Sequence, residues 1–224
     1  MTATIKANEE LLLAALAAFL TPYGYERSKQ DFQKTYRWGR TAFHIAFIKH
    51  NSDFDITGDI GIRSNALEAL VQKSNILLTS AEKKNTFSMG AELANLKDRK
   101  QRRLRVSNEQ DVSTVSTELF RHFEEIAIPY FTKYSDMEAA INVLSSNSFV
   151  AWLHSPIHAE RAKRAVGLAW LLKDFQRAES LIVESEAFLS DSNDFGLSSF
   201  RSFVQLLRES ESIGKIKGDE GYCG

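Results

Sequence analysis

Hydrophobic and polar residues alternate with a period of two on both sides of a short polar break near residue 51. The first segment reads AFHIAFIKH (42–50), the break reads NSD, and the second segment reads FDITGDIGIR (54–63). Alternation of this kind predicts strands with one face in a core and the other face partly in water. The two segments therefore predict a pair of antiparallel strands.

The polar break also predicts how these strands pair. If the turn consists of Asn51 and Ser52 alone, His44 lies opposite Asp59; a longer turn over 51–54 keeps the same faces but separates the two side chains. A carboxylate beside an imidazole can form an acid–base pair. We favour a simple cross-strand hydrogen bond, because no nucleophile or metal motif accompanies His44 and Asp59.

Further elements are expected in the first 110 residues. The apolar run LLLAALAAFL predicts a buried helix from about Asn8 to Pro22, since ten apolar residues are too few to span a bilayer. Alternation predicts a strand at 32–38, which turns at Gly39-Arg40, a weak strand at 87–93 and an edge strand at 101–106. A short helix is expected after Ser64.

From Asp111 onward the hydrophobic period becomes helical. We expect a helix capped by Asp111 and ended by Pro129, and another that begins at Ser155-Pro156 and runs to about Leu172. Two more helices are expected at about 175–189 and 197–207. The sequence thus predicts an α+β fold with a mainly antiparallel sheet of four or five strands packed with helices (1–110). An all-helical half (111–214) packs on it in one continuous body, and a flexible tail follows (215–224).

Composition narrows the choice of partners and compartment. The formal net charge is −1, so no overall field attracts nucleic acid or an anionic membrane. The single cysteine, Cys223, cannot form an internal disulfide, which fits a reducing compartment, and we expect a cytoplasmic protein. No motif indicates a cofactor, and no membrane partner is expected.

The densest charge in the chain is the run KDRKQRRLR at 97–105, with six basic residues in nine. These are Lys97, Arg99, Lys100, Arg102, Arg103 and Arg105. Such a run can bind the phosphates of a nucleic acid or an acidic protein partner. A solvated loop or edge strand is the commoner role of such a run, and aromatic residues do not interrupt it.

Two histidines, His154 and His158, are four residues apart, a spacing that places both on one face of a helix for a metal. Pro156 lies between them, and Ser155 resembles a helix cap, so His154 is expected outside the helix. We therefore favour structural roles over a metal site.

Parts of the chain resemble two known families. The segments FLTPYGYERS, FQKTYRW, FHIAFIKH and VSTELFRHFEEIAIPYFTKY resemble the bacterial family of uncharacterised domains catalogued as "domain of unknown function 4304". This resemblance covers about residues 20–145 and implies a compact α+β fold with no assigned activity.

Residues 159–189 resemble a single tetratricopeptide-type helical hairpin. Ala165, Ala169 and Ala178 match its small-residue positions, and Lys173-Asp174 matches its turn, where Lys173 replaces the usual glycine. Because a stack generally needs about three repeats, one copy indicates a hairpin docked on the domain. The resemblance implies contact with another protein.

No reactive constellation appears in the sequence. We therefore expect a non-catalytic bacterial domain that binds another protein, with an immunity- or inhibitor-like role as one version by analogy. One alternative is an enzyme with its site on the polar face of the sheet, formed where His44, His50, Asp55, Asp59 and Arg63 converge in a pocket. Another is nucleic-acid binding through 97–105, with an affinity that falls steeply with salt.

Overall fold

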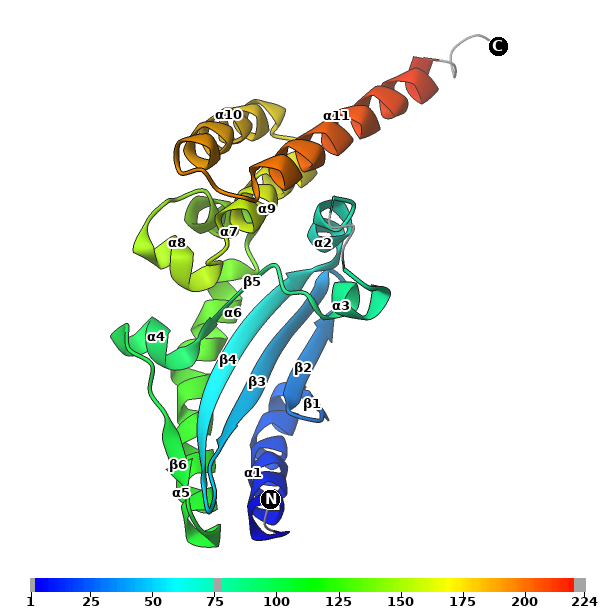
Figure 1. Cartoon of the computed structure of the whole chain (residues 1–224). Coiled ribbons are helices and arrows are strands. Elements are labelled where there is room, and N and C mark those ends of the chain that lie inside the picture. The colour runs from blue at the N-terminus through cyan, green and yellow to red at the C-terminus, as the bar shows by residue number, and fades with distance from the viewer. Residues whose placement is uncertain (1–2, 75–77, 220–224) are drawn as a thin grey trace. The chain divides into compact units, whose positions relative to one another are not determined.

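The computed structural model describes residues 3–74 and 78–219, which form an α+β fold (Figure 1). The described residues contain a six-stranded antiparallel sheet with the strand order β1-β2-β3-β4-β5, in which β6 also pairs with β4. The predicted fold class is confirmed, and β1 is a strand that the sequence pattern did not predict. No helix in this part of the chain is long and apolar enough to cross a membrane.

The elements are as follows. The strands are β1 (Glu26–Ser28), β2 (Asp31–Tyr36), β3 (Gly39–Lys49), β4 (Phe54–Ser64), β5 (Met89–Glu92) and β6 (Leu104–Val106). The α-helices are α1 (Ala3–Leu20), α2 (Asn65–Val71), α3 (Ser80–Asn85), α4 (Leu93–Asp98), α5 (Glu109–His122), α6 (Ile128–Tyr134), α7 (Met137–Leu144), α8 (Phe149–His154), α9 (His158–Leu171), α10 (Phe175–Asp191) and α11 (Leu197–Asp219). Two short helical segments of other types are η1 (Thr21–Tyr23) and η2 (Phe123–Ala127).

The chain forms two compact units whose boundaries differ from the expected division at residue 110. The sheet unit contains residues up to 64 together with 89–136, and the helical unit contains residues 65–88 and those from 137 onward. Residues 111–136 belong to the sheet unit because α5 packs on α1 and β6, while α2 packs on α9. The single continuous body stays a prediction.

The hairpin of β3 and β4 has the predicted register. Phe47 lies opposite Ile56, and His44 lies opposite Asp59. The backbone N–H of His50 donates to the carbonyl of Asp53 at 2.9 Å, which closes the short turn between the strands. The polar break therefore fixes the pairing, as the period-two pattern requires.

The core of the sheet unit is aromatic. Phe123 is fully buried, and its ring centroid lies 5.1 Å from that of Tyr25 and 5.6 Å from that of Phe43. Figure 1 shows α1, α5 and α6 on the same side of the sheet. This side receives Phe43 and its alternating neighbours, and we call the opposite side the outer face.

The helix expected to end before Pro129 instead continues to Tyr134. The η2 segment is wider than an α-helix, and the N–H of Ile128 donates to the carbonyl of Phe123, five residues earlier. The wider segment immediately precedes Pro129. Proline lacks a backbone donor and clashes with the preceding turn of a regular α-helix. The N-cap is also different, because Asn108 and Asp111 form a capping box.

The helical unit contains the predicted hairpin of α9 and α10, but several of its helix boundaries differ from the sequence prediction. Helix α9 begins at His158 rather than at Pro156, and Ser155 follows α8, a helix that was not predicted. Lys173 has φ 62° in the turn, a left-handed conformation that glycine adopts without the steric cost that a side chain brings. Helix α11 continues to Asp219, so the expected flexible tail overlaps it; the last tail residues, with Cys223, lie outside the described residues.

Candidate functional site

Four ionisable side chains form one row across four neighbouring strands on the outer face of the sheet. Asp31 on β2 pairs with His44 on β3, His44 with Asp59 on β4, and Asp59 with Glu92 on β5. Residues directly opposite in an antiparallel pair have Cβ atoms about 4.5–5.5 Å apart. We call these four residues the ionisable row.

The alternation of the strands places the row on the outer face. The next row along the sheet consists of the apolar residues Phe32, Phe43, Ile60 and Ala91. Because successive side chains of a strand point to opposite faces, burial of this apolar row directs the ionisable row outward. The same pattern that forms the core thus positions the candidate site.

His44 bonds to Asp31 rather than to Asp59, the partner that we expected. Its Nδ1 lies 2.9 Å from Oδ1 of Asp31, and the two side chains are 39% and 36% exposed. This hydrogen bond fixes the orientation of the imidazole and leaves Nε2 for another partner.

Asp59 and Glu92 form a pair of carboxyl groups that lie directly opposite each other. Burial raises the pKa of both groups, and His44 partly offsets the effect on Asp59. The charge of Asp59 raises the pKa of Glu92 further, and hydrogen bonds from the backbone of Arg102 and the side chain of Gln101, together with the charge of Arg103, offset this rise in part. Asn95 donates to Glu92 at 3.2 Å, whereas no hydrogen bond to Asp59 forms within the described ranges. Like charges in adjacent positions favour the uptake of a proton or a cation.

The other end of the outer face carries positive charge. Arg40 lies opposite Arg63, and burial together with the charge of Arg63 lowers the pKa of Arg40. Between these arginines and the ionisable row lies a row of small residues, Ala42, Gly61 and Gly90. The four residues from Asp59 to Arg63 correspond to about 14 Å along the strand. The outer face therefore has a basic end and an acidic end, and the buried residues Ala42 and Gly61 lie between them.

The structure does not bring together the five residues of the expected enzyme site. His50 Nε2 lies 3.2 Å from Asp55 Oδ2 near the hairpin turn, and Arg105 donates to Asp55 at 3.1 Å. Burial opposes the charge of Asp55, but the hydrogen bonds from His50 and Arg105 outweigh it and lower the pKa. Positions 55 and 63 lie about 27 Å apart along β4, so these side chains line a strand and do not converge.

Half of the basic residues in the run 97–105 form ion pairs within the sheet unit. Lys97 is on α4, Arg105 is on β6, and the other four are in the segment that joins them. The nitrogen–oxygen distances are 3.5 Å for Lys97–Glu125, 3.6 Å for Arg102–Glu118 and 3.1 Å for Arg105–Asp55. These carboxylates reduce the positive potential that the run offers to a phosphate backbone.

His154 and His158 have separate environments. His154 is the last residue of α8 and is buried, whereas Nδ1 of His158, at the start of α9, lies 2.8 Å from Nη2 of Arg161. Within residues 3–74 and 78–219, no group of three or more His, Cys, Asp or Glu side chains is arranged to hold a metal ion.

No protein-family model, curated protein or solved structure matches the chain. The two family resemblances therefore stay predictions. Sequence reasoning identified His44 and Asp59 but missed Asp31 and Glu92, the residues that extend the pair into a row.

Proposed function

We propose that this protein is a non-catalytic binding domain that recognises another protein through the outer face of its sheet. The observation that carries the proposal is the pair Asp59 and Glu92, two carboxyl groups placed opposite each other with raised pKa values. A folded protein gains no stability from such an arrangement. A lysine or arginine of a partner would neutralise it on binding.

The charge distribution on the outer face also specifies the partner. The arginines Arg40 and Arg63 lie about 14 Å from the carboxyl pair, at the other end of the small-residue row. We expect a partner segment with a basic side chain over Asp59 and Glu92 and an acidic side chain near Arg40, the more exposed of the two arginines. Complementary charges of this kind increase specificity and the rate of association.

Exposed apolar side chains of the helical unit support a protein partner. Phe149, Trp152 and Ile157 are 51%, 48% and 62% exposed, and the rings of Phe149 and Trp152 stack with centroids 5.8 Å apart. Adjacent large apolar groups on a surface are typical of protein–protein contacts.

We infer the compartment and the specific role from the sequence. The single cysteine fits a reducing compartment, and we place the protein in the bacterial cytoplasm. An immunity- or inhibitor-like role is a concrete version, based on analogy.

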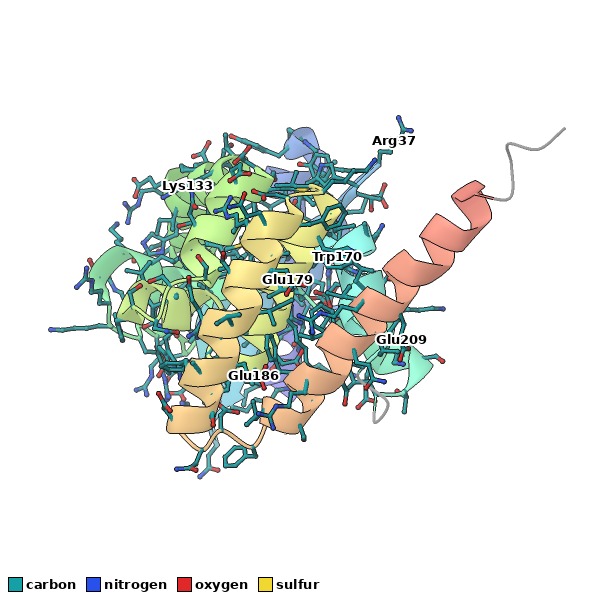
Figure 2. The ribbon with its side chains drawn as sticks, turned by 90° about the horizontal axis from the view of Figure 1, so that it is seen from above. Arg37, Lys133, Trp170, Glu179, Glu186 and Glu209 are labelled. Carbon is teal, nitrogen blue, oxygen red and sulfur yellow. The ribbon has the colours of Figure 1, made fainter. Side chains whose placement is uncertain are left out.

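Capture of partners from a lysate of the source organism tests the proposal. The variant Asp59→Asn/Glu92→Gln removes two negative charges from the row with little change in shape. The matched control Glu179→Gln/Glu186→Gln removes two negative charges from α10, where Figure 2 shows both residues. We expect one stoichiometric protein to bind the wild type and the control but not the row variant. Retention of that protein by the row variant would contradict the proposal.

An enzyme is the second candidate, because the bond from Asp31 orients His44 beside two carboxyl groups. His44→Ala distinguishes the two: an enzyme loses turnover, whereas a binding domain whose contact is made by Asp59 and Glu92 keeps its partner. Charge reversal at Arg102 and Arg103 tests the nucleic-acid alternative, and it leaves the sheet-face residues unchanged.

A further inference from the structure

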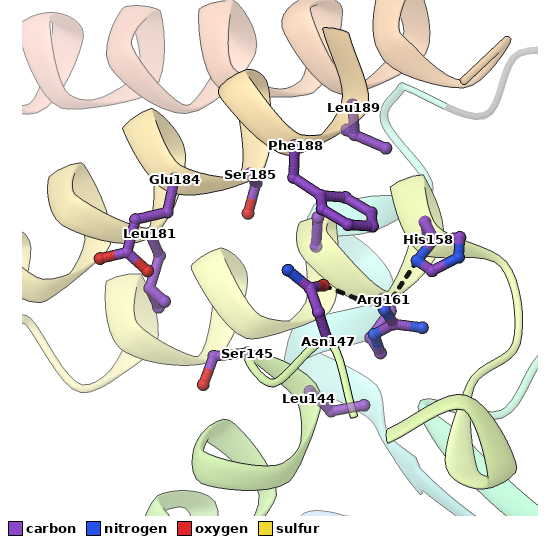
Figure 3. Close-up of a pocket in the computed structure, with 11 residues that line it drawn as sticks. Leu144, Ser145, Asn147, His158, Arg161, Leu181, Glu184, Ser185, Phe188 and Leu189 are labelled. Atoms are coloured by element: carbon purple, nitrogen blue, oxygen red, sulfur yellow. Dashed lines mark hydrogen bonds between the residues drawn. The ribbon is translucent and has the colours of Figure 1, made fainter. Parts of the chain in front are cut away.

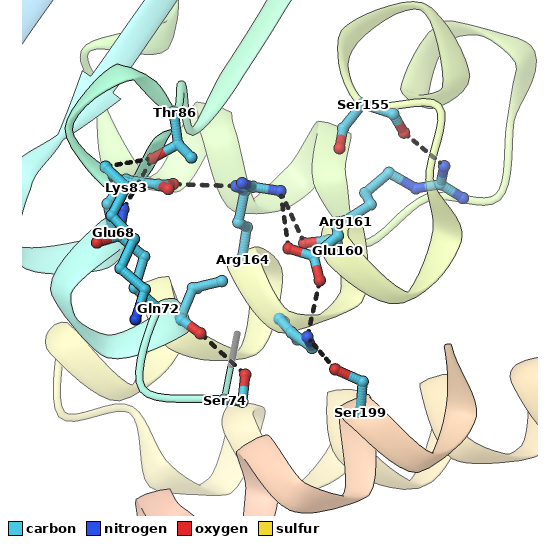
Figure 4. A network of polar contacts seen from close by, with 12 residues as sticks. Glu68, Gln72, Ser74, Lys83, Thr86, Ser155, Glu160, Arg161, Arg164 and Ser199 are labelled. Carbon is cyan, nitrogen blue, oxygen red and sulfur yellow. Dashed lines mark hydrogen bonds and ion pairs between the residues drawn. The ribbon is translucent and has the colours of Figure 1, made fainter. Parts of the chain in front are cut away.

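Helix α9 carries three basic side chains that are buried in the helical unit. Lys163 is 0% exposed and donates to Oε1 of Glu160 and Oγ of Ser199, at 2.7 Å in each case. Arg164 donates to Oε1 of Glu68 at 3.0 Å (Figure 4). Lys163 and Arg164 therefore each have a carboxylate as counter-charge.

Arg161, the third of these residues, is 2% exposed and has only neutral partners. It donates to the carbonyl oxygen of Ser155 at 2.9 Å (Figure 4). It also donates to Nδ1 of His158 at 2.8 Å and to Oδ1 of Asn147 at 3.4 Å (Figure 3). No carboxylate of the described chain lies within the 4.0 Å of an ion pair. A guanidinium has five N–H groups, so donors remain after these three contacts.

The guanidinium of Arg161 lines a cavity of about 40 Å³, with Ser145, Asn147, His158, Ser185 and Phe188 in its wall. This space exceeds the roughly 10–15 Å³ that one water needs, so a small polar group fits. Since arginine only donates, Nδ1 of His158 is an acceptor and the proton of the neutral ring is on Nε2. Serine hydroxyls supply further donors.

We propose that this cavity binds the oxyanion group of a ligand, either a carboxylate or a phosphate, with Arg161 as its counter-charge. Arginine matches the geometry of both groups through two parallel hydrogen bonds. Burial lowers the pKa of Arg161, as expected of a cation removed from water without a counter-charge. Figure 3 shows Glu184 at the end of the cavity away from Arg161, which opposes a second negative charge on the ligand.

Asn147→Asp provides a direct test, since it places a carboxylate at the atom that now accepts from Arg161. Asn142→Asp is the matched control, because Asn142 accepts from Arg177, which already pairs with Glu138. Thermal unfolding of the full chain is measured with increasing sodium phosphate, sodium acetate, and sodium chloride at equal ionic strength. Binding gives a rise in the midpoint that grows with the logarithm of the anion concentration above Kd and that depends on Arg161, whereas the general stabilisation by phosphate is the same in every variant.

We expect phosphate or acetate, at a concentration a few times its Kd, to raise the midpoint of the wild type and of Asn142→Asp by about 3 °C. Asn147→Asp should be more stable without the anion and should lose this response. The anion that acts on the wild type identifies the ligand class. The same response to chloride, or a response in Asn147→Asp or in Arg161→Gln as large as that of the wild type, would overturn the proposal.

Discussion

The two units differ in whether their ionisable side chains are paired with opposite charges. In the helical unit, Glu68 and Lys163 are fully buried, and each has an oppositely charged partner within 3.0 Å. In the sheet unit, the carboxyl groups of Asp59 and Glu92 are only partly buried, yet they lie opposite each other, and neither forms an ion pair within the described residues. In the buried pairs, each charge is neutralised by an opposite charge in the folded state, whereas the two carboxyl groups of the ionisable row lie beside a like charge. This difference is the physical reason to assign binding to the row.

The largest effect in this comparison is expected from breaking a buried pair. Arg164→Met leaves the carboxylate of Glu68 buried without its cation, and we expect a loss of about 3–5 kcal/mol in the free energy of unfolding. Urea unfolding measures it. The double variant Glu68→Leu/Arg164→Met removes both charges and should recover most of the loss. A loss below about 1 kcal/mol in Arg164→Met would show that the pair is not a structural element.

Two neighbouring residues of β3, Phe43 and His44, lie on opposite faces of the sheet. Phe43 is fully buried, so Phe43→Ala should lower the free energy of unfolding by about 3–5 kcal/mol. His44 is on the outer face, and His44→Ala should lower it by less than about 1 kcal/mol. Both values come from urea unfolding under the same conditions. Equal losses would show that the outer face contributes to stability as the core does.

The sequence predicted the half of the ionisable row that depends on a short local turn. In a regular hairpin, the two residues of the turn fix which residues of the two strands lie opposite each other. The polar break at Asn51 therefore predicted that His44 lies opposite Asp59. The sequence predicts that the turn between β2 and β3 consists of Gly39 and Arg40, and this turn would put Thr35 opposite His44. The observed pairing of Tyr36 with Gly39 shifts the register and brings in Asp31.

The rest depends on contacts between distant segments. Glu92 joins the row through β5, a strand of four residues with weak alternation. The sequence does not predict that the charged residues of α9 are buried, because it gives no sign that Glu68 lies beside Arg164, 96 positions away. Local patterns set the strands, whereas tertiary packing decides which charges are paired.

The pH dependence of stability should reveal the carboxyl pair. The folded state raises the pKa of Asp59 and Glu92 above their ordinary values of 3.8 and 4.5, so it binds protons more tightly than the unfolded state. The stability that protonation provides is complete below those ordinary values and is lost as the pH rises through the folded pKa values. Relative to Asp59→Asn/Glu92→Gln, the wild type should therefore gain stability as the pH falls below 7. A constant difference from pH 7 to 4 in urea unfolding would contradict these shifts.

The smallest effect is expected at exposed ion pairs. Arg208 lies 2.6 Å from Glu179 on the surface of the helical unit, and both side chains are about half exposed. Arg208→Gln should change the free energy of unfolding by less than about 1 kcal/mol, because solvent screens such pairs. A larger loss in urea unfolding would mean that α10 and α11 depend on this contact.

The free energy of unfolding of Asp59→Asn/Glu92→Gln at pH 7 tests most directly whether the ionisable row serves binding rather than folding. Our account predicts a value equal to or above that of the wild type, because the substitutions remove two carboxylates that repel each other. A value lower by about 1 kcal/mol or more would show that the two carboxylates hold the fold together, and it would contradict the assignment.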